Sequence, residues 1–461
     1  MSRCFSREWL VLWLSVVLIG WTAPAAAHAP PQVFEAKWQP DGDGLLLVTN
    51  RGLIFGDTGF DRWRIMCTLA VGLNTIERPD VAYLPGGKLI LASSGGLQAT
   101  TDDGCTWELV EPFGDLSAPA MAQHPLQPST LLVATFGVGQ SAIQKTTDGG
   151  ETFSMLRKAE DNDFIEEILF ASSAPDSLYE SGQVFDAAGS IMHYVALSND
   201  AGLTWQRNQV PLHDDESNFT LLAVDPHDPN VVLAKAEASE PTLQNDRLLI
   251  STDGGQSFTS PLSILQISAA AFSADSATLW VAGIEGLWRS RDHGETFEQL
   301  PGKSRITSVT DHDGMLWAGG YYAVDTDGLA ASTDSGDTFT KLLAFPDVKE
   351  QVACDAASKT ATECRMPWQD WQREQFGIVD AGTAPPATDA GPVTQRDAGD
   401  KDAAPTAASN GAKSGGCGCM TAPVGNATTA ARTLLFGLVA WSARWRRRAT
   451  RRGHPPHTPS L

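Results

Sequence analysis

The chain has 461 residues, a formal net charge of -22, 19% charged residues and 42% hydrophobic ones. This balance excludes both a disordered polyelectrolyte and a membrane protein with many spans. The acidity argues against a nucleic-acid partner, because a phosphate backbone is bound by a basic surface. With 42 glycines, 27 prolines and 14 tryptophans, the composition favours a turn-rich β-structure.

The first 27 residues have the pattern of a secretory signal peptide. Arg3 and Arg7 precede an apolar run at residues 9–19, and three alanines follow at 25–27. A positive start, a short apolar core and a small-residue exit are typical of an export signal. The run is shorter than the ~20 residues that a membrane span needs. We therefore expect residues 1–27 to be removed on export.

One eight-residue motif recurs along residues 33–345. It reads Ser/Thr-x-Asp-x-Gly-x-Thr/Ser-aromatic, and its aspartates are Asp102, Asp148, Asp200, Asp253, Asp292 and Asp334. A seventh, eroded copy contains Asp57, with Trp63 one position late. The hydroxyl and carboxylate can bond the backbone of a turn, the glycine permits a positive φ, and the aromatic side chain can enter the core. The motif therefore predicts a tight β-hairpin, and a calcium site is disfavoured because most copies offer too few carboxylates.

This motif resembles the Asp-box, or BNR repeat, of the sialidase-like and sortilin-like β-propellers. That resemblance implies that the box is structural and lies away from the ligand. Successive aspartates are 39 to 53 residues apart, and one four-stranded blade takes ~40–50 residues. We therefore expect an all-β, seven-bladed β-propeller at 33–345, with four antiparallel strands in every blade and no strand donated across the ring closure.

The face opposite the repeated turns is the expected ligand face. Two long intervals between copies insert sequence there, at residues 181–194 and 236–247. The candidate ligand residues are Asp186, Tyr194, Glu240, Arg247, Tyr321 and Tyr322, and the same segments carry His193, Glu237, Asp246, Asp325 and Asp327. Carboxylates beside aromatic rings can bind sugars or a cationic peptide. Solvated loop charge is the competing interpretation of each residue.

The chemistry-bearing patterns favour binding over catalysis. The Arg-Ile-Pro motif that precedes the first box in sialidases is absent, and arginine is scarce across 33–345. Another glycoside hydrolase that uses two carboxylates is the alternative. No phosphate loop, nucleophile elbow or metal-ligand spacing is present, so we expect no cofactor and no metal. The leading hypothesis is a monomeric, non-catalytic propeller at the cell surface that binds an extracellular protein, peptide or glycan.

Four cysteines remain once the two ends are set aside. They are Cys67, Cys105, Cys354 and Cys364, and an even number in an exported domain predicts two disulfides. Of the three possible pairings we favour Cys67–Cys105 with Cys354–Cys364, because the first two fall in neighbouring repeats and the last two close a short loop. Residues 346–378 are expected to form a small ordered appendage.

The C-terminal region has the composition of a linker followed by a sorting signal. Residues 380–416 are rich in Ala, Asp, Gly, Pro, Thr and Ser, a composition typical of a disordered linker. Residues 417–452 contain Cys417, Cys419, a short apolar stretch and an arginine cluster. This tail resembles the C-terminal sorting signal of myxobacterial surface proteins, which implies recognition by sorting machinery and surface display. A membrane anchor is the alternative.

Overall fold

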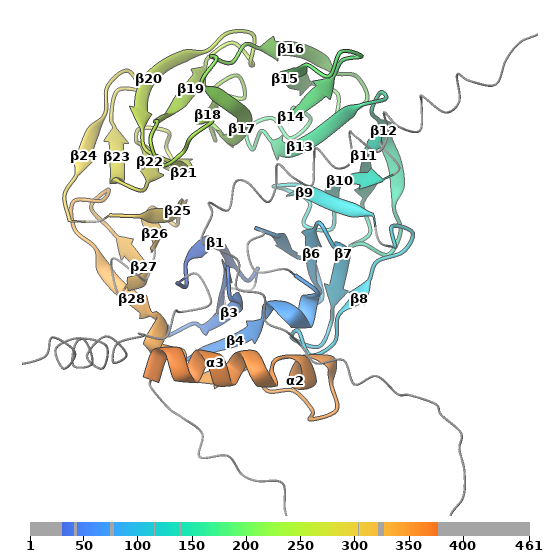
Figure 1. Ribbon diagram of the computed structural model, residues 1–461, viewed down its shortest axis with the longest axis vertical. Helices are drawn as coiled ribbons and strands as arrows, with labels where there is room; N and C mark the ends of the chain where they lie inside the picture. Colours follow the sequence, from blue (N-terminus) through green and yellow to red (C-terminus); the bar gives the residue numbers. More distant parts are fainter. Residues whose placement is uncertain are drawn as a thin grey trace, which may run out of the picture. The chain divides into compact units, whose positions relative to one another are not determined.

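The computed structural model describes residues 30–376, apart from 41–43, 74–77, 115, 138–139, 303 and 321–326. Seven sheets follow one another along the chain, each built from four consecutive antiparallel strands. The sheets are arranged as blades around one axis (Figure 1). The predicted all-β, seven-bladed propeller is confirmed.

The strand bounds follow the blade order. Blades one to three consist of β1 (Val33–Trp38), β2 (Gly44–Thr49), β3 (Gly52–Asp57), β4 (Trp63–Cys67); β5 (Asp80–Tyr83), β6 (Leu89–Ser93), β7 (Gly96–Thr100), β8 (Glu108–Leu109); β9 (Ser117–Gln123), β10 (Leu131–Gly137), β11 (Gln140–Thr146) and β12 (Ser154–Lys158). Blades four and five consist of β13 (Asp163–Phe170), β14 (Leu178–Phe185), β15 (Ile191–Ser198), β16 (Gln206–Val210); β17 (Glu216–Val224), β18 (Val232–Ala238), β19 (Asp246–Ser251) and β20 (Thr259–Ile264). Blades six and seven consist of β21 (Ile267–Phe272), β22 (Leu279–Gly283), β23 (Gly286–Ser290), β24 (Glu298–Leu300); β25 (Ile306–His312), β26 (Met315–Gly320), β27 (Asp327–Ser332) and β28 (Thr340–Ala344).

The core lies between blades, because each sheet is covered on both faces by its neighbours. The second strand of a blade is accordingly a continuous apolar run, and every residue of β2 is buried. Seven apolar clusters each join one blade to the next. One of them packs Trp317 and Leu329 of blade seven against Leu47 and Ile54 of blade one. This contact closes the ring.

Closure uses no exchanged inner strand among the described residues, as expected. The hydroxyl of Thr307 in blade seven donates to the carbonyl of Val33 in blade one at 2.5 Å. The chain leaves blade seven through a short 3-10 helix (Phe345–Asp347) and adds β29 (Glu350–Gln351) in parallel to β4, on the outer edge of blade one. Blade one therefore has a fifth strand that the sequence did not predict.

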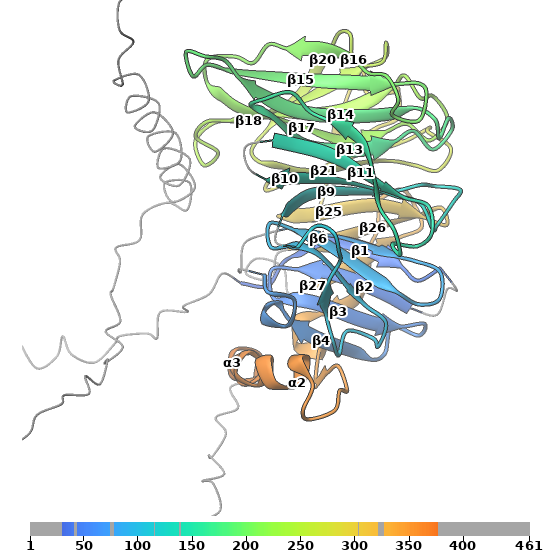
Figure 2. The same ribbon diagram turned by 90° about the vertical axis from the view of Figure 1, so that its right-hand side faces the viewer.

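The appendage after β29 lies beside blades one and two. It contains α2 (Lys359–Glu363) and α3 (Arg365–Phe376), which lie next to β4 in both views (Figures 1 and 2). The hydroxyl of Thr360 donates to the carbonyl of Gly104 in blade two at 2.6 Å. Trp371 is buried, and its indole nitrogen donates to the carbonyl of Val348 at 3.1 Å. The appendage is thus packed onto the ring.

The favoured disulfide pairing is wrong. The structure joins Cys67 to Cys364 and Cys105 to Cys354, with a Cα–Cα distance of 5.4 Å in each bridge. The reason is that β29 and α2 carry each appendage cysteine to a different blade. The short 3-10 helix Thr68–Val71 follows Cys67 directly, and α2 packs against it. Closeness in sequence between Cys354 and Cys364 did not decide the pairing.

Several predicted segments lie outside the described residues. They are the signal peptide, the linker at 380–416, and the tail with Cys417 and Cys419. In the part of the chain that the structure describes, no helix is both long enough and apolar enough to cross a membrane.

Candidate functional site

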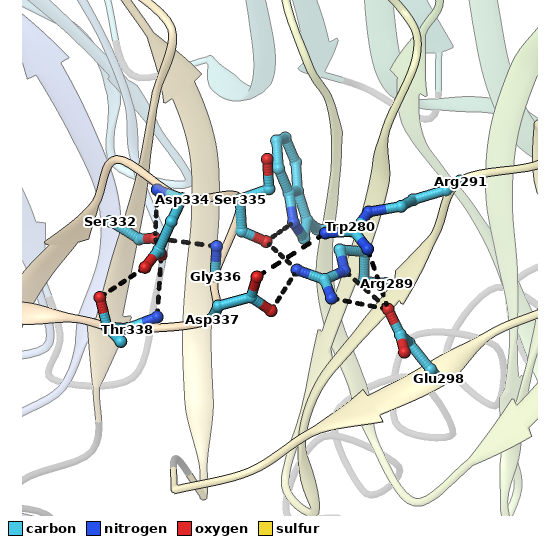
Figure 3. A network of polar contacts seen from close by, with 10 residues as sticks. All are labelled: Trp280, Arg289, Arg291, Glu298, Ser332, Asp334, Ser335, Gly336, Asp337 and Thr338. Carbon is cyan, nitrogen blue, oxygen red and sulfur yellow. Dashed lines mark hydrogen bonds and ion pairs between the residues drawn. The ribbon is translucent and has the colours of Figure 1, made fainter.

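The repeated turns share one hydrogen-bond pattern in all six full copies. The first hydroxyl donates to the aspartate Oδ1 at 2.7–2.8 Å and accepts from the glycine nitrogen at 2.8–3.1 Å. In the last copy, the nitrogen and hydroxyl of Thr338 donate to the two oxygens of Asp334 at 2.8 and 2.6 Å (Figure 3). Each turn lies between the third and fourth strands of its blade.

In five of the six full copies, both carboxylate oxygens accept hydrogen bonds inside the turn. Hydrogen bonds from the side chain and backbone of the following Ser or Thr lower the pKa to about 2 in Asp253, Asp292 and Asp334. In the eroded copy, the Asp57 Oδ1 accepts a longer bond, 3.3 Å, from the Arg62 nitrogen. The aspartates of the full copies thus stabilise their turns.

A polar joint between blades six and seven was missed by sequence reasoning. The guanidinium of Arg289 is 4% exposed and binds Glu298 at 2.7 Å and Asp337 at 2.8 Å. It also donates to the carbonyl of Ser335 at 2.9 Å, which accepts from the Trp280 indole at 3.0 Å (Figure 3). The repeat turn of blade seven is thereby held on blade six.

A cavity forms a central channel among the seven blades. Its volume is about 910 Å³, and the innermost strands of all seven blades line it. Strand direction places residues at the start of each inner strand near the mouth opposite the repeat turns. There Arg78 lies over the Phe34 ring at 4.7 Å. At the other end, Trp38 and His312 stack with a centroid separation of 3.9 Å.

Carboxylates gather in this channel around one lysine. Glu35 and Lys37 come from β1, Asp80 from β5 and Glu167 from β13, so three blades contribute. The Lys37 Nζ lies 2.7 Å from Glu35. Burial and the neighbouring Glu35 raise the pKa of Asp80 to about 7. Burial and Asp80 together raise the pKa of Glu167 well above its usual range. The ammonium group of Lys37 is thus shared electrostatically by three carboxyl groups, those of Glu35, Asp80 and Glu167.

The channel cluster was missed because its members are far apart in sequence. One signal in the sequence was available: Glu35 and Lys37 are two residues apart in an inner strand, so both charged side chains lie on the same face of it. Inner strands carry side chains alternately toward the channel and toward the wall. The sequence-based prediction placed the ligand residues in the inserted segments between strands instead of in the channel.

The predicted ligand-face residues have different surroundings. Asp186 is exposed at the tip between β14 and β15, where its Oδ1 accepts from the nitrogens of Ala188 and Ser190 at 2.8 Å. Glu240 is exposed between β18 and β19. Arg247 binds Glu216 through two guanidinium nitrogens, one at 2.8 Å. Asp186 and Glu240 thus lie on the expected face, whereas Arg247 is committed to an ion pair.

Tyr194 was predicted to lie on the ligand face, but the structure buries it inside blade four. It is 2% exposed, and its hydroxyl lies 2.8 Å from both Asp163 and Glu180. Arg157 pairs with Glu180, and Arg207 pairs with Asp163 while covering the tyrosine ring at 3.8 Å. Burial raises the pKa of Tyr194, so the phenol stays neutral. This side chain belongs to the interior and cannot meet a ligand.

Tyr321, Tyr322 and Asp325 lie outside the described residues. Glu237 lines the channel, where it pairs with Lys235 at 2.8 Å. Among the described residues, no group of three or more His, Cys, Asp and Glu side chains is arranged to hold a metal ion.

The structural neighbours of the chain are distant from it in sequence. No family model and no curated protein matches the chain. Among solved structures, it is 14% identical to an ancestral GH74 enzyme over 69% of this chain and 55% of that one, with a TM-score of 0.46. A hydrazine synthase of Kuenenia stuttgartiensis is 14% identical over 69% of this chain and 100% of that one, with a TM-score of 0.47. The Dos1 propeller is 13% identical over 73% of this chain and 88% of that one, with a TM-score of 0.44. The chain spans about half of the ancestral GH74 enzyme.

Proposed function

We propose that the chain is a non-catalytic propeller that binds an extracellular protein, peptide or glycan. The observation that carries this proposal is the central channel. Its volume of about 910 Å³ lies in the range of ligand pockets, ~300–1,000 Å³. Three carboxyl groups around Lys37, with aromatic side chains at both ends, suit a ligand that carries a cationic or polyhydroxylated group.

The second part of this proposal concerns the cellular location of the protein. Two disulfides indicate an oxidising compartment outside the cytoplasm. Display at the cell surface or outer membrane, through sorting machinery that recognises the tail with Cys417 and Cys419, agrees with that indication. In this proposal the sorting machinery also cleaves the tail. Mass spectrometry of mature protein tests the cleavage, and an intact C-terminus at Leu461 would contradict it. Light scattering in solution tests the monomeric state.

The repeat turns support membership in the Asp-box superfamily, the sialidase-like and sortilin-like propellers. The support is the shared bonding of hydroxyl, carboxylate and glycine in six copies. In this proposal the turns hold the blades, and binding takes place in the channel and on the opposite face.

A binding experiment tests the channel. Purified full chain is screened against arrays of glycans and basic peptides, and Glu167→Gln is compared with the control Glu295→Gln, an exposed residue of the repeat turn in blade six. We expect at least a ten-fold loss of affinity for the channel variant and no change for the control. Equal affinity of both variants for every ligand found would refute the channel as the site.

A glycoside hydrolase is the second candidate, and one observation favours it. Burial and Glu35 raise the pKa of Asp80 to about 7, whereas Glu35 is paired with Lys37, and two carboxyl groups in different environments are what glycoside hydrolysis requires. Incubation of the full chain with a panel of polysaccharides decides between the two. Release of reducing ends that is abolished in Asp80→Asn would favour the hydrolase over the binding protein.

A further inference from the structure

A second polar cluster lies between blades four and five, and one of its members, Glu237, also lines the channel. It consists of Glu166 in β13, Gln183 in β14, His193 in β15 and Glu237 in β18. Gln183 and His193 are directly paired across β14 and β15, so their side chains share one face of blade four. The Gln183 amide donates to Glu166 Oε1 at 2.6 Å. We name these four residues the Glu166 cluster.

Two polar atoms of the Glu166 cluster have no hydrogen-bond partner. They are the second oxygen of Glu166 and Nδ1 of His193, and both atoms are buried. His193 as a whole is 6% exposed. Buried polar atoms without a partner are rare in folded proteins, because desolvation is then uncompensated. Glu166 and Gln183 are only half-buried, so the cluster reaches the surface.

The electrostatics of the cluster favour a cationic guest. Burial and the nearby Glu237 raise the pKa of Glu166 to about 7. Burial lowers the pKa of His193, so the imidazole is neutral at neutral pH. Glu237 already pairs with Lys235, and within the described part of the chain no lysine or arginine pairs with Glu166. A hydrogen-bond donor with a positive charge would satisfy the free Glu166 oxygen.

An apolar ridge adjoins this cluster on the face opposite the repeat turns. The rings of Phe136, Phe164 and Phe185 form a row with centroid separations of 4.7 and 5.2 Å. Ile191, directly opposite Phe185, and the next residue, Met192, are 48% and 42% exposed. Exposed apolar side chains grouped in this way mark interaction surfaces.

Acidic residues border the ridge. The nitrogen of Phe185 donates to the carbonyl of Asn162, which brings the exposed Glu160 and Asp161 next to the ridge. Asp186 follows Phe185 and is exposed, while Lys158 offsets part of this charge. A basic partner is therefore attracted, whereas a second copy of this chain, with a net charge of -22, is repelled.

We propose that the ridge and the Glu166 cluster together dock a polypeptide segment of a partner protein. The segment carries apolar side chains that cover Phe164, Phe185 and Ile191, and beside them a lysine or arginine whose cation reaches Glu166. This inference rests on the proposed binding function and names the class of partner. The ridge and Glu166 are not part of the channel lining, although Glu237 borders both sites.

Selection from a peptide library tests the proposal. Random dodecapeptides displayed on phage are selected on the full chain, and the enriched peptides are synthesised and titrated by fluorescence anisotropy. We expect every strong binder to contain Lys or Arg within two positions of Phe, Leu, Ile or Trp. Enrichment of peptides without a cation, or no enrichment, would overturn the proposal.

Variants then locate the binding surface. The double variant Ile191→Asp, Met192→Asp should weaken binding at least ten-fold, and Glu166→Gln at least three-fold. The matched control is Leu126→Asp, an exposed apolar residue on the repeat-turn face, which should bind as the parent does. Loss of binding in Glu167→Gln but not in the double variant would overturn the docking surface and leave the channel proposal standing.

Discussion

At the scale of single residues, the buried hydroxyl of Tyr194 offers a clear test of the interior of blade four. Tyr194→Phe removes a group that lies 2.8 Å from both Asp163 and Glu180, which are completely buried. Removing a partner of a buried charged group costs about 1.5–3 kcal/mol. We expect a decrease of that size in the free energy of unfolding, measured with urea.

The matched control is another buried tyrosine. Tyr179→Phe loses one bond of 2.6 Å to the carbonyl of Pro229, a neutral contact worth about 0.5–1.5 kcal/mol. A loss for Tyr194→Phe no larger than that for Tyr179→Phe would show that the carboxylates do not depend on the phenol.

The repeat-turn aspartates predict how stability depends on pH. Their pKa is lowered to about 2 in Asp253, Asp292 and Asp334, against ~3.9 for an unfolded chain. A lowered pKa adds stability that is present above pH ~4 and is lost as the pH falls toward 2. Replacing all three by asparagine should therefore reduce stability at pH 5 and flatten its decline between pH 4 and 2. Urea midpoints at several pH values measure this, and parallel curves for parent and variant would contradict it.

At the scale of elements, the turn glycine determines how closely two blades approach. Gly294 has a φ of +88°, and a Cβ there would lie 2.4 Å from Ile250 Cδ1 of the preceding blade. Gly294→Ala therefore combines a left-handed residue, about 1–2 kcal/mol, with overpacking, about 1–3 kcal/mol. Gly149→Ala is the control, because its φ is +76° with open space around it, so only the first cost applies. Chemical denaturation should rank Gly294→Ala as clearly the more damaging.

The same scale shows what the sequence could and could not predict. Ser332, Asp334 and Gly336 act within five residues of chain, so their hairpin was predictable, and its repetition led to the blade count. The Cys67–Cys364 bridge spans 297 residues, and the channel cluster combines three blades. Such contacts depend on how distant strands are placed around the ring. Tyr194 was misplaced for a related reason, since the composition of an inserted segment does not reveal which side chains point inward.

At the scale of the whole molecule, the appendage ties the end of the ring to its beginning. Both disulfides connect residues after blade seven to blades one and two, across separations of 297 and 249 residues. They therefore reinforce the seam where blade seven meets blade one through apolar packing. Cross-links that close long loops stabilise by about 2–5 kcal/mol, because they restrict the unfolded chain.

Removing the bridges should release the appendage before it unfolds the propeller. We expect Cys67→Ser with Cys364→Ser to lower the thermal midpoint, and the additional pair Cys105→Ser with Cys354→Ser to expose residues 346–376 to trypsin at Lys349 and Lys359. The parent protein, treated in parallel, should resist cleavage there because β29, α2 and both bridges hold that segment on blades one and two. Cleavage at equal rates in parent and quadruple variant would mean that the packing of Trp371 and β29 suffices, and that the cross-links do not secure the seam.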